Sequence, residues 1–473
     1  MSDATPLPPF AERVRRAVGD AHLHDAIARA TGQLEARRGA AFDSLEQAEL
    51  VRDHARRAKL TALARLDLML ETFERNLVKN GIQVHWARDG AEACAIVLEI
   101  ARARGLKRAV KAKSMLTEEI HLNPALQAAG IEVVESDLGE YVVQLADDRP
   151  SHIILPIIHL TKEDVGRVMA RRLSVPYTPE PKELCKIARG RLRGEFLAAD
   201  LGISGGNFGV VETGSICLVS NEGNLRMTTT LPRVHVALLG IEKLVSTLAD
   251  LDAMVKVLAR SATGQKITVY TSIVNGPRRG AADEIAPEEV HVVLLDNGRS
   301  ATLAGEEAEI LACIRCGACL NACPVFHNIG GHAYGDVYPG PMGSVLTPAL
   351  RGLPQWQELP QASSLCGACR EVCPVRIDLP RMLLALRAAS VERHGAPRSL
   401  RCGMRAFAFL ATRPRWFAFA RRVGGAIVRR LARDGWLKRA PGLLAGWTAH
   451  RDLLAPKRRS FDDWWKERQR GRA

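Results

Sequence analysis

The sequence predicts a mixed α/β body, followed by a cysteine-rich segment and a basic helical tail. Three observations support this division. Apolar strand-like runs alternate with helical stretches up to about residue 300, seven of the eleven cysteines fall within residues 313–373, and most of the net positive charge follows Gly395. The domains expected are 1–60 (helical), 61–303 (α/β), 304–390 (cysteine-rich) and 391–473 (tail).

The composition is that of an ordinary globular protein, with 47% hydrophobic and 25% charged residues among 473. This excludes wholesale disorder and a membrane-embedded bundle, and no apolar run approaches the roughly 18 residues of a spanning helix. The first residues, MSDATPLPPFAERVRRAVGD, lack the apolar region of a secretory signal. We therefore expect a cytoplasmic protein, in which grouped cysteines indicate metal or redox chemistry rather than disulfides.

The body is expected to contain a mostly parallel sheet, because strands alternate with helices. Residues 43–80 form a long helical pattern, with leucines spaced among charged residues. The strand candidates are 81–87, 108–114, 131–137, 152–158, 203–220, 233–240, 267–274 and 290–296. The helical stretches between them are about 90–104, 161–172, 181–199 and 241–260.

Two motifs in the body invite a functional interpretation. GISGG at 202–206 matches G-x-S-x-G, but a nucleophile elbow needs a strand before the serine and a helix after it, and the order here is reversed. The glycines do not fit a dinucleotide fingerprint either, so close backbone packing or a turn near a ligand is the better interpretation. Glu212 stands in an apolar strand, where it is either a hydrogen-bonded core or turn residue or a site carboxylate.

The cysteine spacing is the strongest signal in the chain. The first group reads C-x2-C-x2-C-x3-C-P and consists of Cys313, Cys316, Cys319 and Cys323, before Pro324. The second reads C-x2-C-x3-C-P and consists of Cys366, Cys369 and Cys373, before Pro374. Structural zinc prefers two ligand pairs at wider separation, so zinc fits poorly. The four scattered cysteines are expected to be structural residues that fill the core: Cys94, Cys185, Cys217 and Cys402.

This spacing predicts two cubane iron–sulfur clusters, most simply [4Fe–4S]. In two-cluster ferredoxins the fourth cysteine of each motif binds the other cluster. The first cluster would then be held by Cys313, Cys316, Cys319 and Cys373, and the second by Cys323, Cys366 and Cys369. A complete second motif would have cysteine at position 363, where this chain has Ser363. The fourth ligand of the second cluster could be Ser363, His327, His332, a partner protein or solvent, and loss of that iron would leave a three-iron cluster.

The tail holds the positive charge. From Gly395 onward there are 20 Lys and Arg against 5 Asp and Glu, whereas the preceding residues carry 46 and 47. Because the body is neutral, we do not expect a nucleic-acid-binding protein. Five of the seven tryptophans also lie in the tail: Trp416, Trp436, Trp447, Trp464 and Trp465. Aromatics beside arginines suit partner docking, which we favour, or an anionic membrane surface. The simpler alternative is a solvated appendage folded on its own body.

The sequence resembles the lactate-utilisation family. The resemblance rests on KAKSMLTEEI (111–120), SDLGEYVVQL (136–145), PSHIILPIIHL (150–160), VVETGSICLVSNEGNLRM (210–227) and TTLPRVHVALLGIEKLV (229–245). Three further segments are similar to the family's iron–sulfur member: the block 313–348, SSLCGACREVCPVRIDLP (363–380) and SFDDWWKE (460–467). The match covers most of the chain.

The resemblance implies a fold of the sugar-isomerase and CoA-transferase type for the body. It also implies oxidation of L-lactate to pyruvate together with two companion proteins, A and C, with this chain as the electron-carrying subunit. The absence of an eighth cysteine belongs to the family pattern. The residues KSM (113–115) and ETG (212–214) match family motifs, but no catalytic residue follows from them.

Three functions are therefore compared. The first is an electron-transfer subunit of a lactate-oxidising complex, which two clusters suit because each carries single electrons. The second is a stand-alone α/β enzyme with structural or regulatory clusters. The third, a nucleic-acid-binding protein that uses its tail, is disfavoured by the neutral body.

Overall fold

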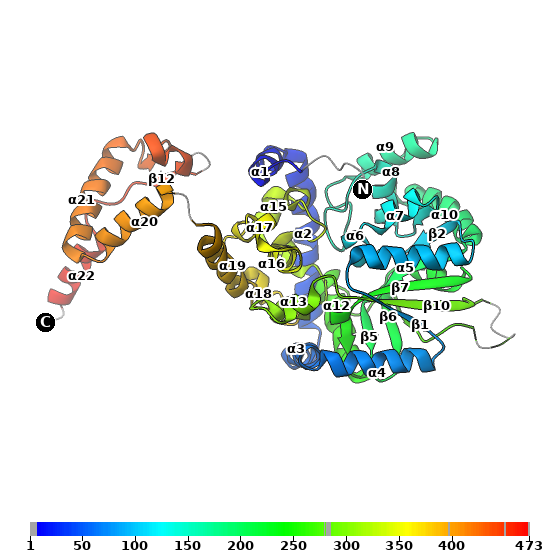
Figure 1. The fold of residues 1–473 in the computed structure, drawn as a ribbon. Helices are drawn as coiled ribbons and strands as arrows, with labels where there is room; N and C mark the ends of the chain where they lie inside the picture. Colours follow the sequence, from blue (N-terminus) through cyan, green and yellow to red (C-terminus); the bar gives the residue numbers. More distant parts are fainter. Residues whose placement is uncertain (1–6, 279, 281–284, 396–397, 449–450, 472–473) are drawn as a thin grey trace. The chain divides into compact units, whose positions relative to one another are not determined.

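The structure is a computed structural model that describes residues 7–278, 280, 285–395, 398–448 and 451–471. The chain divides into two compact units, 1–392 and 393–473, and each is described by itself (Figure 1). The four domain boundaries expected from the sequence stay predictions.

A six-stranded sheet forms the centre of the first unit. Its strands are β1 (Gln83–Ala87), β2 (Arg108–Lys111), β3 (Glu132–Glu135), β4 (Leu201–Gly205), β7 (Val234–Gly240) and β10 (Glu289–Leu295). Their order is β1-β10-β7-β4-β2-β3, and all neighbours are parallel. The inner strands β7 and β10 are nearly continuous runs of buried apolar residues, as expected for a sheet covered on both faces. The mixed α/β body with a parallel sheet is thus confirmed, whereas the sugar-isomerase and CoA-transferase label stays a prediction.

Helices cover both faces of this sheet. The α-helices that begin in the first unit are α1 (Phe10–Val18), α2 (Ala21–Asp43), α3 (Ala48–Ala64), α4 (Leu66–Lys79), α5 (Gly90–Ala103), α6 (Met115–Glu119), α7 (Leu122–Ala128), α8 (Leu138–Ala146), α9 (Lys162–Leu173), α10 (Pro181–Ala198), α11 (Asn224–Thr230), α12 (Leu248–Ala262), α13 (Arg299–Leu303), α14 (Ala318–Asn321), α15 (Pro324–Ile329), α16 (Gly340–Arg351), α17 (Leu353–Trp356), α18 (Ala368–Glu371) and α19 (Leu379–His394). The 3₁₀ helices are η1 (Ile241–Lys243), η2 (Ala308–Ala312), η3 (His332–Tyr334) and η4 (Leu359–Gln361). Val236 and Leu238 of β7 pack with α5 and α7, whereas Ala237 and Leu239 pack with α4 on the opposite face (Figure 1).

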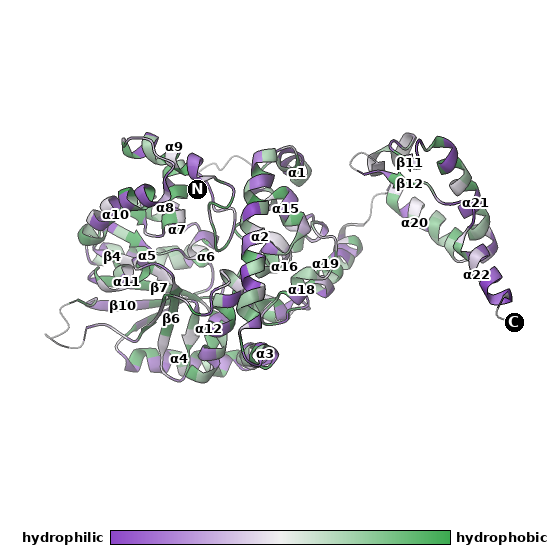
Figure 2. Ribbon diagram, turned by 180° about the vertical axis from the view of Figure 1, so that it is seen from behind, coloured by the Kyte–Doolittle hydropathy of each residue, from purple (hydrophilic) through white to green (hydrophobic). Residues whose placement is uncertain are grey.

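A second, four-stranded sheet lies beside the first. It contains β8 (Leu244–Val245), β5 (Phe208–Val210), β6 (Ser215–Ser220) and β9 (Tyr270–Val274), in that order. Its inner residues share one hydrophobic core with α3, α12 and the cysteine-rich segment, and this core includes Val210, Met254 and Leu311. Figure 2 shows hydrophobic residues gathered on β6 and β7. Because one core spans both parts, the body and the cysteine-rich segment pack as a single unit.

Three expectations about the body need correction. Residues 152–158 form turns rather than a strand, because the His152 ring accepts hydrogen bonds from the backbone N–H groups of Ile154 and Leu155 and Pro156 lacks an N–H. The segment 203–220 forms the end of β4 and all of β5 and β6, in two different sheets. The pattern at 43–80 forms two helices that break at Arg65, because α3 packs in the core shared with the cysteine-rich segment and α4 packs on the central sheet.

The second unit is a small helical assembly. It contains α20 (Arg398–Ala411), α21 (Pro414–Leu431), β11 (Trp436–Leu437), η5 (Gly442–Thr448), β12 (Leu453–Leu454) and α22 (Phe461–Arg470). The ion pair between Arg421 and Asp462 joins α21 to α22, and β11 pairs with β12 in antiparallel fashion. Among the helices that the structure describes, none is long and apolar enough to cross a membrane.

Candidate metal centre

The cysteines predicted for the first cluster lie around one small cavity. Cys313, Cys316, Cys319 and Cys373 line it together, with Ile153, Ile314 and Val375 among the apolar residues of its wall. The loop that follows η2 turns back on itself through left-handed conformations at Arg315 and Gly317, which brings Cys316 and Cys319 to the same side. Thus the structure brings together residues from both motifs, although their binding of iron stays a prediction.

The donor set fits an iron–sulfur cluster. Burial raises the pKa of Cys316 to about 12 and that of Cys373 to about 11, so these thiols would stay protonated without a nearby cation. Iron supplies that cation and binds the thiolate form. Backbone N–H groups already point at the sulfurs, since Arg315 donates to Cys313 Sγ at 3.4 Å and Ile377 donates to Cys373 Sγ at 3.3 Å. Such N–H···S contacts are among the protein's means of setting a cluster's potential.

Arginines from the N-terminal helices hold the Cys373 loop in place. Arg38 donates to the carbonyl of Val372 at 2.8 Å, Arg52 donates to that of Cys373 at 2.8 Å, and Arg56 donates to that of Arg376 at 2.5 Å. The expected helical segment 1–60 therefore has a definite role, because it satisfies carbonyls that a loop beside a cluster would otherwise leave unpaired. Sequence reasoning did not find these arginines, because they are far from the cysteines along the chain.

The second group lies nearer the surface. Cys366 is exposed, whereas Cys323 and Cys369 are buried. The three thiols lie close together, because Cys323 and Cys366 both raise the pKa of Cys369. The backbone N–H of Ala368 and the Ser364 hydroxyl lower the pKa of Cys366. This lowered pKa favours the thiolate, which is the form that binds iron.

The three side chains considered as a fourth ligand have different surroundings. Ser363 Oγ accepts a hydrogen bond from the Leu365 N–H at 3.1 Å, and the His327 ring bonds to the backbone carbonyl of Asn321. His332 lies with Asp148 and His159 instead. The fourth ligand therefore stays open between Ser363, His327, His332, solvent and a partner.

The second cluster is expected to be the less robust of the two. It has three evident thiolates, and the Cys366 side of the site is exposed to solvent. When anaerobically isolated protein is exposed to air or to a mild chelator, the signal of the second cluster should therefore disappear first. The signal of the first cluster should disappear only later. Electron paramagnetic resonance with iron analysis would follow this, and simultaneous loss would contradict it.

A larger cavity of about 480 Å³ adjoins the first cluster site. Ile153 and Ile314 line both cavities. Its polar groups include Lys113, Glu222 and Lys243. The volume lies within the roughly 300–1,000 Å³ typical of pockets for organic ligands.

Several charged groups of this cavity are perturbed by burial. Burial raises the pKa of Glu222 to about 7 and lowers that of Lys243 to about 7. Among the residues that the structure describes, the Lys243 ammonium has no hydrogen-bond or ion-pair partner. Its neighbour Glu242 is tied to Arg299 at 2.7 Å, and Arg299 also forms two 2.9 Å bonds to Glu119. The unpaired amino group is thus available to an anion in the cavity, which would favour its protonated form.

The sequence motifs of the body differ in whether they line this cavity. Lys113, Ser114 and Met115 of KSM line the cavity, as do Gly205 and Gly206 of GISGG. A Cβ at Gly205 would lie 2.5 Å from Ser114 Oγ, which shows the close packing expected of these glycines. Glu212 does not line it: its carboxylate is exposed and accepts a hydrogen bond from the Leu248 N–H at 2.9 Å, as a turn residue would. The expectation that Glu212 lies inside an apolar strand is therefore wrong.

Known families match the α/β body, the cysteine-rich segment and the tail separately. Family models match at residues 70–295 (LUD domain), 309–377 (4Fe-4S dicluster domain) and 388–470 (lactate utilisation protein B, C-terminal). Proteins named lactate utilization protein B from Bacillus pumilus and Shouchella clausii are each 42% identical to this chain, covering 98% of it and 98% and 97% of their own lengths. The counterpart from Geobacillus kaustophilus is also 42% identical, with 98% of each chain covered. A solved structure of a DUF162 family protein from Deinococcus radiodurans is 15% identical, with a TM-score of 0.27 over 49% of this chain and 98% of that one. From the sequence matches, the chain belongs to the lactate utilization protein B family.

Proposed function

We propose that this chain is the iron–sulfur electron-transfer subunit of a complex that oxidises L-lactate to pyruvate. The observation that carries the proposal is the spatial order of three sites in the first unit: the large cavity, the first cysteine group and the second cysteine group. The 480 Å³ cavity shares Ile153 and Ile314 with the first cysteine group, and the second group reaches the surface at Cys366. An electron path from a substrate-sized cavity, past one cysteine group, to an exposed edge is what a relay requires.

The chemistry agrees with two clusters. Oxidation of lactate to pyruvate releases two electrons and two protons, and a [4Fe–4S] cluster accepts one electron at a time. The two groups are neighbours, because the Cys369 thiolate is close enough to act on the pKa of Cys319. The names of the 42% identical relatives link the family to lactate.

The companion proteins A and C are the proposed partners. The chain contains clusters and a cavity, but no constellation in the described residues resembles a complete hydroxy-acid oxidation site, which a companion would supply. Nucleic acid is not a proposed partner, because the residues before Gly395 are nearly neutral in sum.

Reconstitution tests this proposal. The isolated chain, and the chain mixed with proteins A and C, would each receive L-lactate under anaerobic conditions while cluster reduction is followed by absorption and electron paramagnetic resonance. Reduction only in the mixture supports the electron-transfer role. Reduction of the isolated chain would replace it with the second candidate, a stand-alone α/β enzyme, which the internal cavity favours.

Lys243 provides a sharper test of the cavity. Replacing it with Gln removes the unpaired ammonium beside the first cluster site and should slow lactate-dependent reduction about tenfold, equivalent to about 1.4 kcal/mol. Iron content and reduction by dithionite should stay unchanged. Lys256→Gln is the matched control, because that exposed lysine pairs with Asp252 at 2.6 Å away from the cavity. Equal rates in both variants would exclude an electron-entry role for the cavity.

A further inference from the structure

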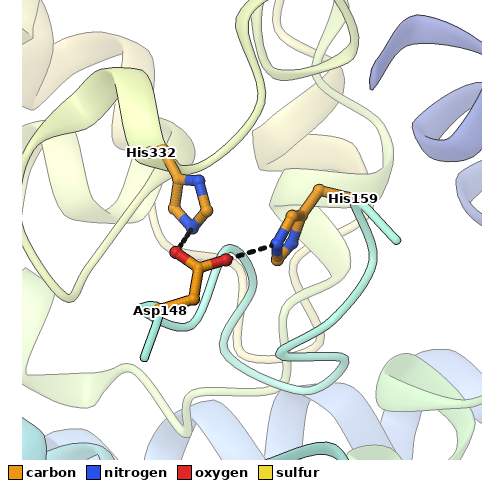
Figure 3. A group of neighbouring side chains, drawn as sticks. All are labelled: Asp148, His159 and His332. Carbon is orange, nitrogen blue, oxygen red and sulfur yellow. Dashed lines mark hydrogen bonds and ion pairs between the residues drawn. The ribbon is translucent and has the colours of Figure 1, made fainter. Parts of the chain in front are cut away.

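Asp148, His159 and His332 converge at a joint between the α/β body and the cysteine-rich segment. Asp148 and His159 come from the segment between α8 and α9, and His332 begins η3 (Figure 3). The joint is tight, because a Cβ at Gly331 would lie 1.8 Å from the carbonyl oxygen of Ser151. Two segments far apart in sequence thus hold these three side chains together.

The three groups are arranged like a set of metal ligands. His159 Nε2 lies 2.9 Å from Asp148 Oδ2. His332 Nε2 lies 3.9 Å from Asp148 Oδ1 and donates a hydrogen bond to the Arg149 carbonyl at 2.7 Å, a bond that metal binding through this atom would replace. One ligand atom from each residue can be chosen so that all lie within 4.8 Å of one another. Zinc bonds to nitrogen and oxygen of about 2.0–2.2 Å place tetrahedral ligands roughly 3.4 Å apart, so modest side-chain rotations would close the set around an ion. Figure 3 shows both imidazole rings directed at the carboxylate.

A second observation points to an absent ligand. The His159 side chain is only 10% exposed, and its Nδ1 has no hydrogen-bond partner among the described residues. A buried polar atom without a partner destabilises the folded state. His159 Nε2 already pairs with Asp148, so the unused lone pair belongs to Nδ1, and Nδ1 is the atom that a cation would engage.

We propose that Asp148, His159 and His332 bind a divalent transition-metal ion, with zinc as the best match. Two imidazoles and one carboxylate are typical zinc donors, and three protein ligands leave one position for water. The ion would clamp the segment before α9 to the cysteine-rich segment. It is separate from the iron sites, because no cysteine belongs to this set.

Metal analysis of the intact protein tests the proposal. The full chain would be isolated anaerobically with its clusters, equilibrated with micromolar Zn²⁺ and freed of unbound metal. We expect about one zinc per chain, with X-ray absorption showing nitrogen and oxygen neighbours near 2.0–2.1 Å and no sulfur near 2.3 Å. Sulfur neighbours would mean that zinc has entered the cysteine groups, which would overturn the proposal, as would the absence of bound zinc.

Variants locate the ion. Asp148→Asn keeps the side-chain shape and should lower the zinc affinity at least tenfold, and His332→Gln should do the same, while iron content stays unchanged. Asp147→Asn is the matched control, because this neighbouring carboxylate is exposed and lies outside the cluster. Zinc binding that is equal in all three variants and the wild type would refute the assignment. A variant that also loses iron has lost its fold, and the other variant then decides.

Discussion

Replacing Cys373 with serine should remove the cluster predicted at Cys313, Cys316 and Cys319, although 54 residues separate Cys373 from Cys319. The reason is the shared cavity, since Cys373 supplies the fourth sulfur around it. Iron should fall from about eight to about four atoms per chain if each cluster holds four. Electron paramagnetic resonance would show which cluster signal disappears.

Two further variants make this result specific. Cys369→Ser should damage the other cluster, because Cys369 lies with Cys323 and Cys366. Cys185→Ser should leave iron unchanged, because that cysteine is exposed on α10 and does not line the cluster cavity. Cys185 and Cys402 are thus exposed, and the expectation that they fill the core is wrong. If Cys373→Ser affects only the second cluster, the crossed ligand assignment is wrong.

Removing residues 395–473 should abolish co-purification with proteins A and C and leave both clusters in place. The first unit, which contains every predicted ligand, ends at residue 392, so cluster assembly does not require the tail. The tail's exposed aromatic side chains are the expected anchors: Phe407, Phe409, Phe419, Trp416, Trp436, Trp464 and Trp465. The side chain of Trp447 lies outside the described residues. Co-purification of the truncated chain at wild-type levels would refute docking through the tail.

Point variants separate docking from other roles of the tail. A buried interface tryptophan often contributes about 2 kcal/mol or more, so replacing Trp464 and Trp465 with alanine should weaken the complex at least about thirtyfold. Lys457→Ala, a change at an exposed charge, should have little effect. Two of the tail arginines already have partners, since the Arg413 guanidinium lies 3.8 Å from the Phe409 ring centre and Arg421 pairs with Asp462. Salt-sensitive binding of the full chain to anionic vesicles would instead identify the tail as a membrane-contacting element.

Long, regular elements of the body followed from the sequence. The strand candidates 233–240 and 290–296 coincide with β7 and β10, because continuous apolar runs are stable only as buried inner strands. The helix expected at 181–199 is α10, which begins with Pro181 at its first turn. The run 152–158 was equally apolar, but its backbone N–H groups bond to the His152 ring, and no periodicity reveals such a contact.

The iron–sulfur chemistry follows from the amino-acid sequence, because cysteine spacing is a local property that a single loop must satisfy. The α/β class and the separate basic tail are also evident from it. The contacts between residues far apart in the chain come from the fold. It places Lys113 and Lys243 in one cavity, leaves Glu212 outside that cavity, and brings His332 beside Asp148 and His159. These encounters depend on how the shared core packs the body against the cysteine-rich segment, and packing between segments far apart in the chain leaves no periodic trace in either one.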